Sequence, residues 1–162
     1  MKGFTFAGVS AAIKKNGKKD LGLIFSEKPA TAAALFTRNK VVAAPVTLGR
    51  EKIKAGLCQA ILVNSGNANC FTGKKGIDDA VACSKMVANA CDIPENLVQV
   101  CSTGVIGAPL PLEKFEPGIT ALKGQLSDTG LTDFADAILT TDLCRKIVTK
   151  TGCIDSKTLP LP

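Results

Sequence analysis

Residues 58–73 read CQAILVNSGNANCFTG, a continuous apolar run followed by a loop rich in asparagine and glycine. The run at 58–64 is typical of a buried central strand. After the loop the period changes, and from Gly76 to Cys91 the apolar side chains recur on one helical face, which predicts a helix over 76–91. A strand, a loop and a helix in this order indicate a fold of the α/β or α+β class.

The rest of the chain continues the same mixture. Between the first two predicted strands, Asn16 and Gly17 are expected to supply the positive φ angles of a tight hairpin turn. Strands are predicted at 3–13, 21–27, 31–37, 41–46, 96–102 and 145–152, and helices near 48–55, 112–126 and 132–139. No internal repeat, low-complexity tract or linker divides the 162 residues, so one domain, or part of one, is expected.

The composition is typical of a soluble globular protein, with 46% hydrophobic and 21% charged residues. No segment approaches the roughly 18 to 20 unbroken apolar residues that a membrane helix needs, so no membrane association is expected. The first ten residues, MKGFTFAGVS, have no long apolar core ending in a small-residue cleavage site. These features predict a cytoplasmic protein.

Missing residue types exclude several kinds of chemistry. The sequence has no His, so Ser-His-Asp triads, Cys-His dyads and His-ligated metal sites are excluded within it, and no metal is expected. It also has no Trp or Tyr, which removes most stacking platforms for single-stranded nucleic acid. Seven cysteines without CxxC spacing, most of them in apolar strings, are interpreted as buried reduced thiols rather than as a zinc or disulfide framework.

The net charge of +6 leaves two interpretations open. Much of it comes from KKNGKK at 14–19 and from Lys74 and Lys75, and we favour a solvated hairpin tip over an arm that binds phosphate. A nucleic-acid partner is therefore not expected, whereas an anionic small-molecule substrate would suit a basic protein.

The loop at 64–73 does not match a nucleotide-binding motif. Counted from Gly66, a Walker A motif requires Gly at position 71, where Phe stands, and no GxGxxG pattern is present. Three asparagines together with Gly66 and Gly73 favour left-handed backbone and local hydrogen bonds, so the loop is expected to be rigid. Both an elaborate turn and a loop that shapes an active site fit this pattern.

Two further segments place polar groups where a strand or a helix ends. In CSTGVIGAPLP, Thr103 and Gly104 close a strand, and a hydroxyl beside a backbone amide can stabilise a developing oxyanion. An ordinary strand-to-helix turn is the alternative. In DAILTTDL, a helix leads into Thr140, Thr141 and an aspartate, which either cap the next element or hold a polar substrate.

The segments NSGNANCFTG, CSTGVIGAPLP and DAILTTDL occur in the order, and at about the spacing, found in the ornithine acetyltransferase (glutamate N-acetyltransferase) family. The N-terminal part, with its FTRN and AAPV segments, also resembles the opening of that family. The resemblance covers residues 3–145 and is to the N-terminal, α-chain part of these enzymes.

The resemblance implies an acyltransferase of arginine biosynthesis that moves an acetyl group from N-acetylornithine to glutamate. In that family the precursor cleaves itself into α and β chains. The new N-terminal Thr of the β chain is the nucleophile of a ping-pong reaction through an acetyl-enzyme, and its own α-amino group serves as the base. The implied fold is an α/β/β/α sandwich built by both chains and assembled as an α2β2 heterotetramer. No cofactor is implied, although some members use acetyl-CoA as a co-substrate.

The site residues are carried over by position. Thr103 and Gly104 match the family's catalytic pair that stabilises the oxyanion. Thr140 and Thr141 match a substrate-binding segment, in which we prefer Thr141 as the contact. The loop at 64–73 then supports the site without supplying a catalytic atom.

This sequence also departs from the family's pattern. The segment that carries the family's substrate-contacting Lys and nucleophilic Thr has no match here, and Leu143 and Cys144 stand where members commonly have Thr and a nearby Pro. We therefore expect residues 1–162 to be an α-chain portion that ends before the autocleavage site and is inactive without a β chain. The competing hypothesis is a truncated or diverged paralogue that binds a ligand or a protein without catalysis.

Overall fold

The computed structural model describes residues 1–154 and 157–161. Its centre is a four-stranded sheet with the strand order β1-β2-β3-β4. The first three strands are antiparallel neighbours, whereas β3 and β4 are parallel, so the chain crosses over between them through a helix. The strands are β1 (Phe4–Val9), β2 (Leu21–Thr31), β3 (Leu57–Asn67) and β4 (Val98–Val105).

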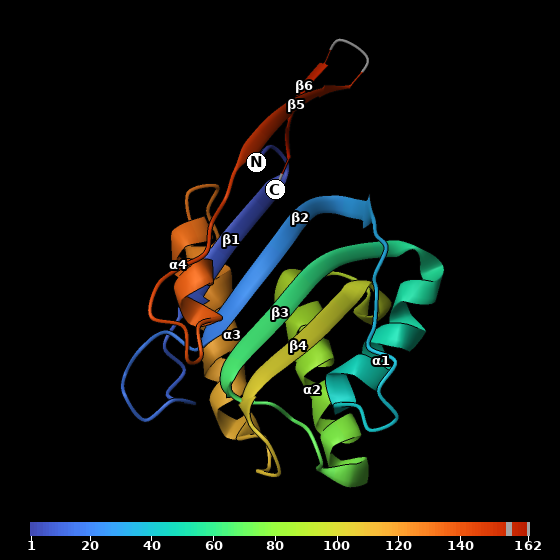
Figure 1. Ribbon diagram of the computed structural model, residues 1–162, viewed down its shortest axis with the longest axis vertical. Helices are drawn as coiled ribbons and strands as arrows, with labels where there is room; N and C mark the ends of the chain where they lie inside the picture. The colour runs from blue at the N-terminus through green and yellow to red at the C-terminus, as the bar shows by residue number, and fades with distance from the viewer. Residues whose placement is uncertain (155–156, 162) are drawn as a thin grey trace.

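Helices cover the two faces of this sheet unequally (Figure 1). They are α1 (Ala44–Lys52), α2 (Gly73–Cys91), α3 (Phe115–Gln125) and α4 (Leu131–Ala137), with 3₁₀ turns η1 (Ile53–Ala55), η2 (Glu95–Leu97) and η3 (Leu112–Lys114). In Figure 1, α2 and α3 lie behind the sheet, α4 lies on the opposite face beside β1, and α1 lies beside β4. A separate hairpin of β5 (Lys150–Ile154) and β6 (Lys157–Leu161) extends beyond the sheet. None of the helices in the described ranges is long and apolar enough to cross a membrane.

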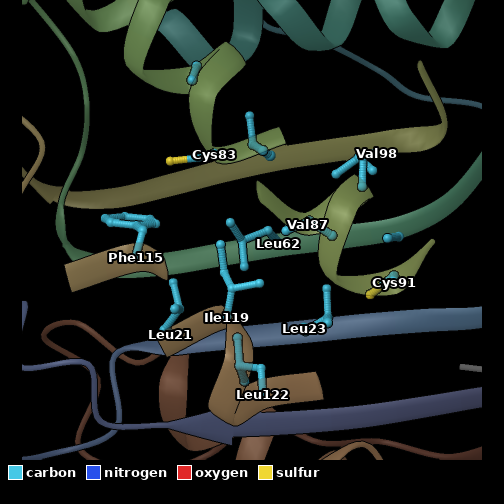
Figure 2. Close-up of a cluster of buried hydrophobic side chains, with 14 of the residues drawn as sticks. Leu21, Leu23, Leu62, Cys83, Val87, Cys91, Val98, Phe115, Ile119 and Leu122 are labelled. Carbon is cyan, nitrogen blue, oxygen red and sulfur yellow. The ribbon is translucent and has the colours of Figure 1, made fainter. Parts of the chain in front are cut away.

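The face toward α2 and α3, called here the inner face, carries the hydrophobic core (Figure 2). Every second residue of each strand contributes to it, as the two-residue period of a strand requires. Leu62 of β3 and Leu23 of β2 are 1% and 0% exposed. They pack against the apolar sides of α2 and α3, whose buried residues include Cys83, Val87, Cys91, Phe115, Ile119 and Leu122.

The opposite face, called here the outer face, is covered only in part. Two glycines let α4 approach β1 and β2: a Cβ at Gly8 would collide with the carbonyl of Asp133, and one at Gly22 would lie 2.8 Å from the ring of Phe134. Ile61 lines two apolar hollows, one of about 400 Å³ bordered by α1 and one of about 540 Å³ bordered by α4. The outer face therefore keeps apolar surface that the described part of the chain leaves uncovered.

The mixed α/β class predicted from the sequence is confirmed, but two strand predictions are wrong. Apart from the last residue of β2, the ranges 31–37 and 41–46 form no strand. Most of the first range is exposed, Leu35 fully so, and of its side chains Phe36 lies against α1, 3.4 Å from where a Cβ on Gly49 would be. The second contains the start of α1, with a proline in the first helical turn, where proline is favoured. The other predicted elements are present with shifted ends, and β5 overlaps only the last residues of the strand predicted at 145–152.

The tight turn predicted at Asn16 and Gly17 is also wrong. A longer loop joins β1 to β2, and of this pair only Gly17 has a positive φ, of 70°. Asp20 organises the loop instead, because its carboxylate accepts hydrogen bonds from the backbone N–H groups of Ala11 and Lys14 at 2.7 and 2.8 Å.

The six cysteines whose side chains the structure describes are free thiols, and their burial agrees with the prediction only in part. Three are buried, one is half-buried and two are exposed: Cys58, Cys83 and Cys91, then Cys70, then Cys101 and Cys144. The side chain of Cys153 lies outside the described part of the chain. Burial raises the pKa of the Cys83 thiol to about 12, with a further contribution from the nearby carboxylate of Asp79.

Candidate active site

Residues 64–73, called here the asparagine loop, comprise the last residues of β3 and the loop after it, and their own asparagines hold them in place. The side-chain amide of Asn64 donates to the carbonyl of Asn67 at 2.8 Å, and that of Asn67 donates to the carbonyl of Pro109 at 2.9 Å. The amide of Asn69 donates to the carbonyl of Gly76 at 2.8 Å, which ties the loop to the start of α2. All three asparagines are buried and bonded to backbone, so this asparagine loop is a rigid support.

Thr103 and Gly104, which the sequence predicts to stabilise an oxyanion and which are called the oxyanion pair for that reason, lie near the end of β4 opposite Ser65 and Gly66 of β3. They belong to the strand and not to the turn after it. Gly104 has a φ of 136°, and a Cβ there would lie 2.6 Å from the backbone nitrogen of Asn67, so glycine is required. Thr103 is half-buried and Gly104 is exposed. Both stand at the carboxyl end of the parallel strand pair, where α/β proteins commonly bind ligands.

Two backbone hydrogen bonds join the loops that follow β3 and β4. The N–H of Ala68 donates to the carbonyl of Val105, and the N–H of Gly107 donates to the carbonyl of Cys70, both at 2.9 Å. The asparagine loop therefore fixes the turn that comes directly after the oxyanion pair.

Thr140 and Thr141 follow α4 and are exposed. The hydroxyl of Ser65 donates to the carbonyl of Ala137 at the end of α4, and Ser65 pairs with Thr103 in the β3–β4 register. The structure thus brings both predicted groups to the same end of the sheet. Within the described residues it contains no hydrogen bond between the oxyanion pair and the two threonines.

Lys14 belongs to this region and was missed by sequence reasoning, which indicates a solvated tip at 14–19. Its ammonium donates to the carbonyls of Leu139 at 2.6 Å and Lys19 at 3.0 Å. Burial lowers the pKa of Lys14 from its ordinary value, and the nearby carboxylate of Asp20 opposes this effect. No local signal marks this role, because 125 positions separate Lys14 from the carbonyl that it holds.

Several charged groups around the two threonines form ion pairs. Lys19 forms an ion pair with Asp133, and Arg145 forms one with Asp136. In the ranges 1–154 and 157–161, no cluster of three or more His, Cys, Asp or Glu side chains is placed to hold a metal ion. The chemistry that the site offers is hydrogen bonding, from a hydroxyl and backbone groups at an accessible strand end.

Comparison with known proteins identifies related sequences. A model of the ArgJ family matches residues 5–160. The chain is 50% identical over 150 residues to the arginine biosynthesis bifunctional protein ArgJ of Syntrophotalea carbinolica, and 51% identical over 160 residues to that of Caldanaerobacter subterraneus subsp. tengcongensis. These matches cover 93% and 99% of this chain but 38% and 40% of the relatives. The chain therefore spans about two fifths of the length of the curated relatives it matches.

Two solved structures share the fold. ArgJ of Bacillus halodurans superposes with a TM-score of 0.90 at 42% identity, covering 99% of this chain and 84% of that one. An ornithine acetyltransferase of Mycobacterium tuberculosis complexed with ornithine gives a TM-score of 0.87 at 38% identity, covering 98% and 86%. The fold is thus that of a class of arginine biosynthesis proteins. The chain belongs to the ArgJ family, which confirms the resemblance to ornithine acetyltransferases.

Proposed function

We propose that this chain is the α-chain portion of a cytoplasmic glutamate N-acetyltransferase, which transfers acetyl from N-acetylornithine to glutamate in arginine biosynthesis. The observation that carries the proposal is the match at a TM-score of 0.87 and 38% identity to an ornithine acetyltransferase that was solved with ornithine bound. The competing hypothesis of a non-catalytic paralogue is not favoured, because identity near 50% extends over nearly the whole chain.

The proposed reaction assigns each site group one task. The Thr hydroxyl of a β chain attacks the acetyl carbonyl of N-acetylornithine, and the resulting oxyanion accepts hydrogen bonds from Thr103 and Gly104. The C–N bond then breaks, ornithine leaves with the proton taken from the hydroxyl, and the acetyl group stays on the enzyme as an ester. The amine of glutamate attacks this ester and restores the free hydroxyl. Thr140 and Thr141 hold the amino-acid part of each substrate, and the reaction needs no cofactor, with acetyl-CoA as a further acetyl donor.

Two observations support the need for a second chain: the lengths of the related chains, and the apolar surface left uncovered on the outer face of the sheet. This chain covers 84% of the solved Bacillus halodurans chain but only 40% of a curated relative. The solved chain is therefore about half as long as that relative. This fits a precursor that cleaves itself into two chains and assembles as α2β2. The uncovered outer face also has a buried side-chain nitrogen, Nε2 of Gln99, without a hydrogen-bond partner among the described residues. A second sheet layer laid on this face would complete the proposed α/β/β/α sandwich, of which residues 1–162 form one part.

An acetyl-transfer assay tests the proposal. The chain is assayed alone and co-expressed with a β chain of the ornithine acetyltransferase family that begins at its nucleophilic Thr. We expect transfer from N-acetylornithine to glutamate only from the co-expressed pair, and a loss of about 10²-fold or more in Thr103→Ala. An inactive pair with a stable monomeric chain would instead favour the non-catalytic paralogue. Transfer by the chain alone would contradict the assignment of the nucleophile to a second chain.

A further inference from the structure

The end of α4 is held by two side chains that are distant in the sequence. The fully buried hydroxyl of Ser65 donates to the carbonyl of Ala137, and the ammonium of Lys14 donates to the carbonyl of Leu139 at 2.6 Å. The carbonyl of Ala137 is the last one of α4 and has no partner within the helix, and that of Leu139 lies just after the helix, so these donors satisfy groups that would otherwise be open. The residue after Leu139 is Thr140, the first of the two substrate-binding candidates.

Asp20 fixes both donors in place. It is fully buried, its carboxylate accepts from the backbone N–H of Lys14 at 2.8 Å, and its carbonyl accepts from the N–H of Ser65 at 2.8 Å. The stem of Lys14 also lies against β3, because a Cβ at Gly66 would be 3.0 Å from its Cγ. A buried carboxylate bonded to backbone is rigid, so neither donor behaves as a mobile surface group.

Ser65 also connects the two halves of the candidate site. Its backbone pairs with Thr103 in β4, while its hydroxyl holds the helix that leads to Thr140. We propose that Ser65 and Lys14 are positioning residues that keep Thr140 and Thr141 at a fixed place relative to the oxyanion pair. The inference rests on the proposed function, because a displacement of about 1 Å between substrate and catalytic groups costs up to about 10²-fold in rate.

Hydrogen exchange of the chain alone tests the holding role without any activity. Lys14→Met keeps the apolar stem and removes the ammonium. The amides of Ile138 and Leu139, which donate to carbonyls of α4, should then exchange roughly tenfold faster, while those of β3 keep their rates. Lys15→Met removes the same charge from the exposed neighbour and should change neither group of amides. Equal exchange in Lys14→Met and the unsubstituted chain would overturn the proposal.

Kinetics of the co-expressed pair test the positioning role. Lys14→Met and Ser65→Ala should raise KM for N-acetylornithine and lower kcat/KM by roughly 10- to 100-fold, with an unchanged amount of acetyl-enzyme formed in a single turnover. Lys14→Arg keeps a cationic donor and should recover most of the loss.

Two other outcomes are informative. Less acetyl-enzyme with an unchanged KM would mean that these residues only stabilise the fold, which would overturn the positioning role. If the unsubstituted pair transfers no acetyl group, the proposed function fails, and the exchange of the Ile138 and Leu139 amides alone decides whether Lys14 holds the segment.

Discussion

The two faces of the central sheet differ in how completely they are packed, and neighbouring residues of β3 display the difference. Leu62 on the inner face is 1% exposed, whereas Ile61 on the outer face is half-buried and lines two apolar hollows. The inner face meets helices of 19 and 11 residues, whereas the outer face meets α4, of 7 residues, and one side of α1 next to β4. The inner face therefore accounts for most of the stability of the chain by itself, and the outer face is the side left for assembly.

Truncating Leu62 and Ile61 separately is the strongest test of this difference. Leu62→Ala should lower the free energy of unfolding by about 3 kcal/mol or more, because it opens a cavity in a closed core. Ile61→Ala should cost about 1 kcal/mol or less in the chain alone, since its side chain is only half-buried. Urea unfolding followed by far-UV circular dichroism measures both, and equal losses would show that the outer face is packed as well as the inner one.

Gly8→Ala tests the region where α4 tightly covers the outer face. The added Cβ meets the backbone of Asp133 and Phe134, which no rotamer change relieves, so we expect a loss of roughly 2 to 3 kcal/mol. The displaced α4 should also become sensitive to limited proteolysis, while the core on the inner face stays folded. A variant as stable and as resistant as the unsubstituted chain would mean that α4 contributes little to the outer face.

Alkaline pH tests the inner face through the Cys83 thiol. The unfolded thiol ionises near pH 9, whereas the buried one stays protonated until about pH 12. Between pH 9 and 12 the native chain therefore binds more protons than the unfolded chain. The stability contributed by this thiol is intact below pH 9 and falls as the pH rises toward 12. The slope from one such group reaches about 1.4 kcal/mol per pH unit. Cys83→Ala should flatten the unfolding free energy against pH, and Cys144→Ala, at an exposed thiol, should leave the slope unchanged.

The smallest effect is expected at Gly124 on the exposed side of α3. An added Cβ meets no atom within 4 Å, and alanine is the better helix former, so Gly124→Ala should stabilise the chain by about 0.5 to 1 kcal/mol. A rise in the thermal midpoint checks this. Destabilisation would indicate that this side of α3 is not free but packs against another part of the molecule.

The elements of the fold that are determined by the local spacing of apolar residues could be predicted from the sequence. The apolar run at 58–64 and the helical spacing over 76–91 correspond to β3 and α2, because burial imposes their periods locally. The ranges 31–37 and 41–46 are also apolar, but Leu35 and Val41 are exposed and Ala44 and Pro45 belong to α1, and composition alone does not say whether an apolar segment pairs as a strand.

The candidate site also contains some residues that could be predicted from the sequence and others that could not. Thr103, Gly104, Thr140 and Thr141 were chosen from motifs, and the structure places them at one end of the sheet, but their roles stay predictions. Lys14 and Ser65 gave no signal in the sequence. Their hydrogen bonds to α4 and the segment after it span 125 and 72 positions, and such contacts exist only once the sheet and α4 have been assembled.

The connectivity also sets an order of events during synthesis. All four strands of the central sheet have been made once Val105 is added, but α4 ends only at Ala137. At a translation rate of about 5 to 20 residues per second, the sheet waits roughly 2 to 6 seconds for the helix that covers part of its outer face. During that interval the nascent chain can bury its inner face with α2 while β1 and β2 remain bare on the other side. A chaperone that binds apolar strands thus has a defined period in which to act on this protein.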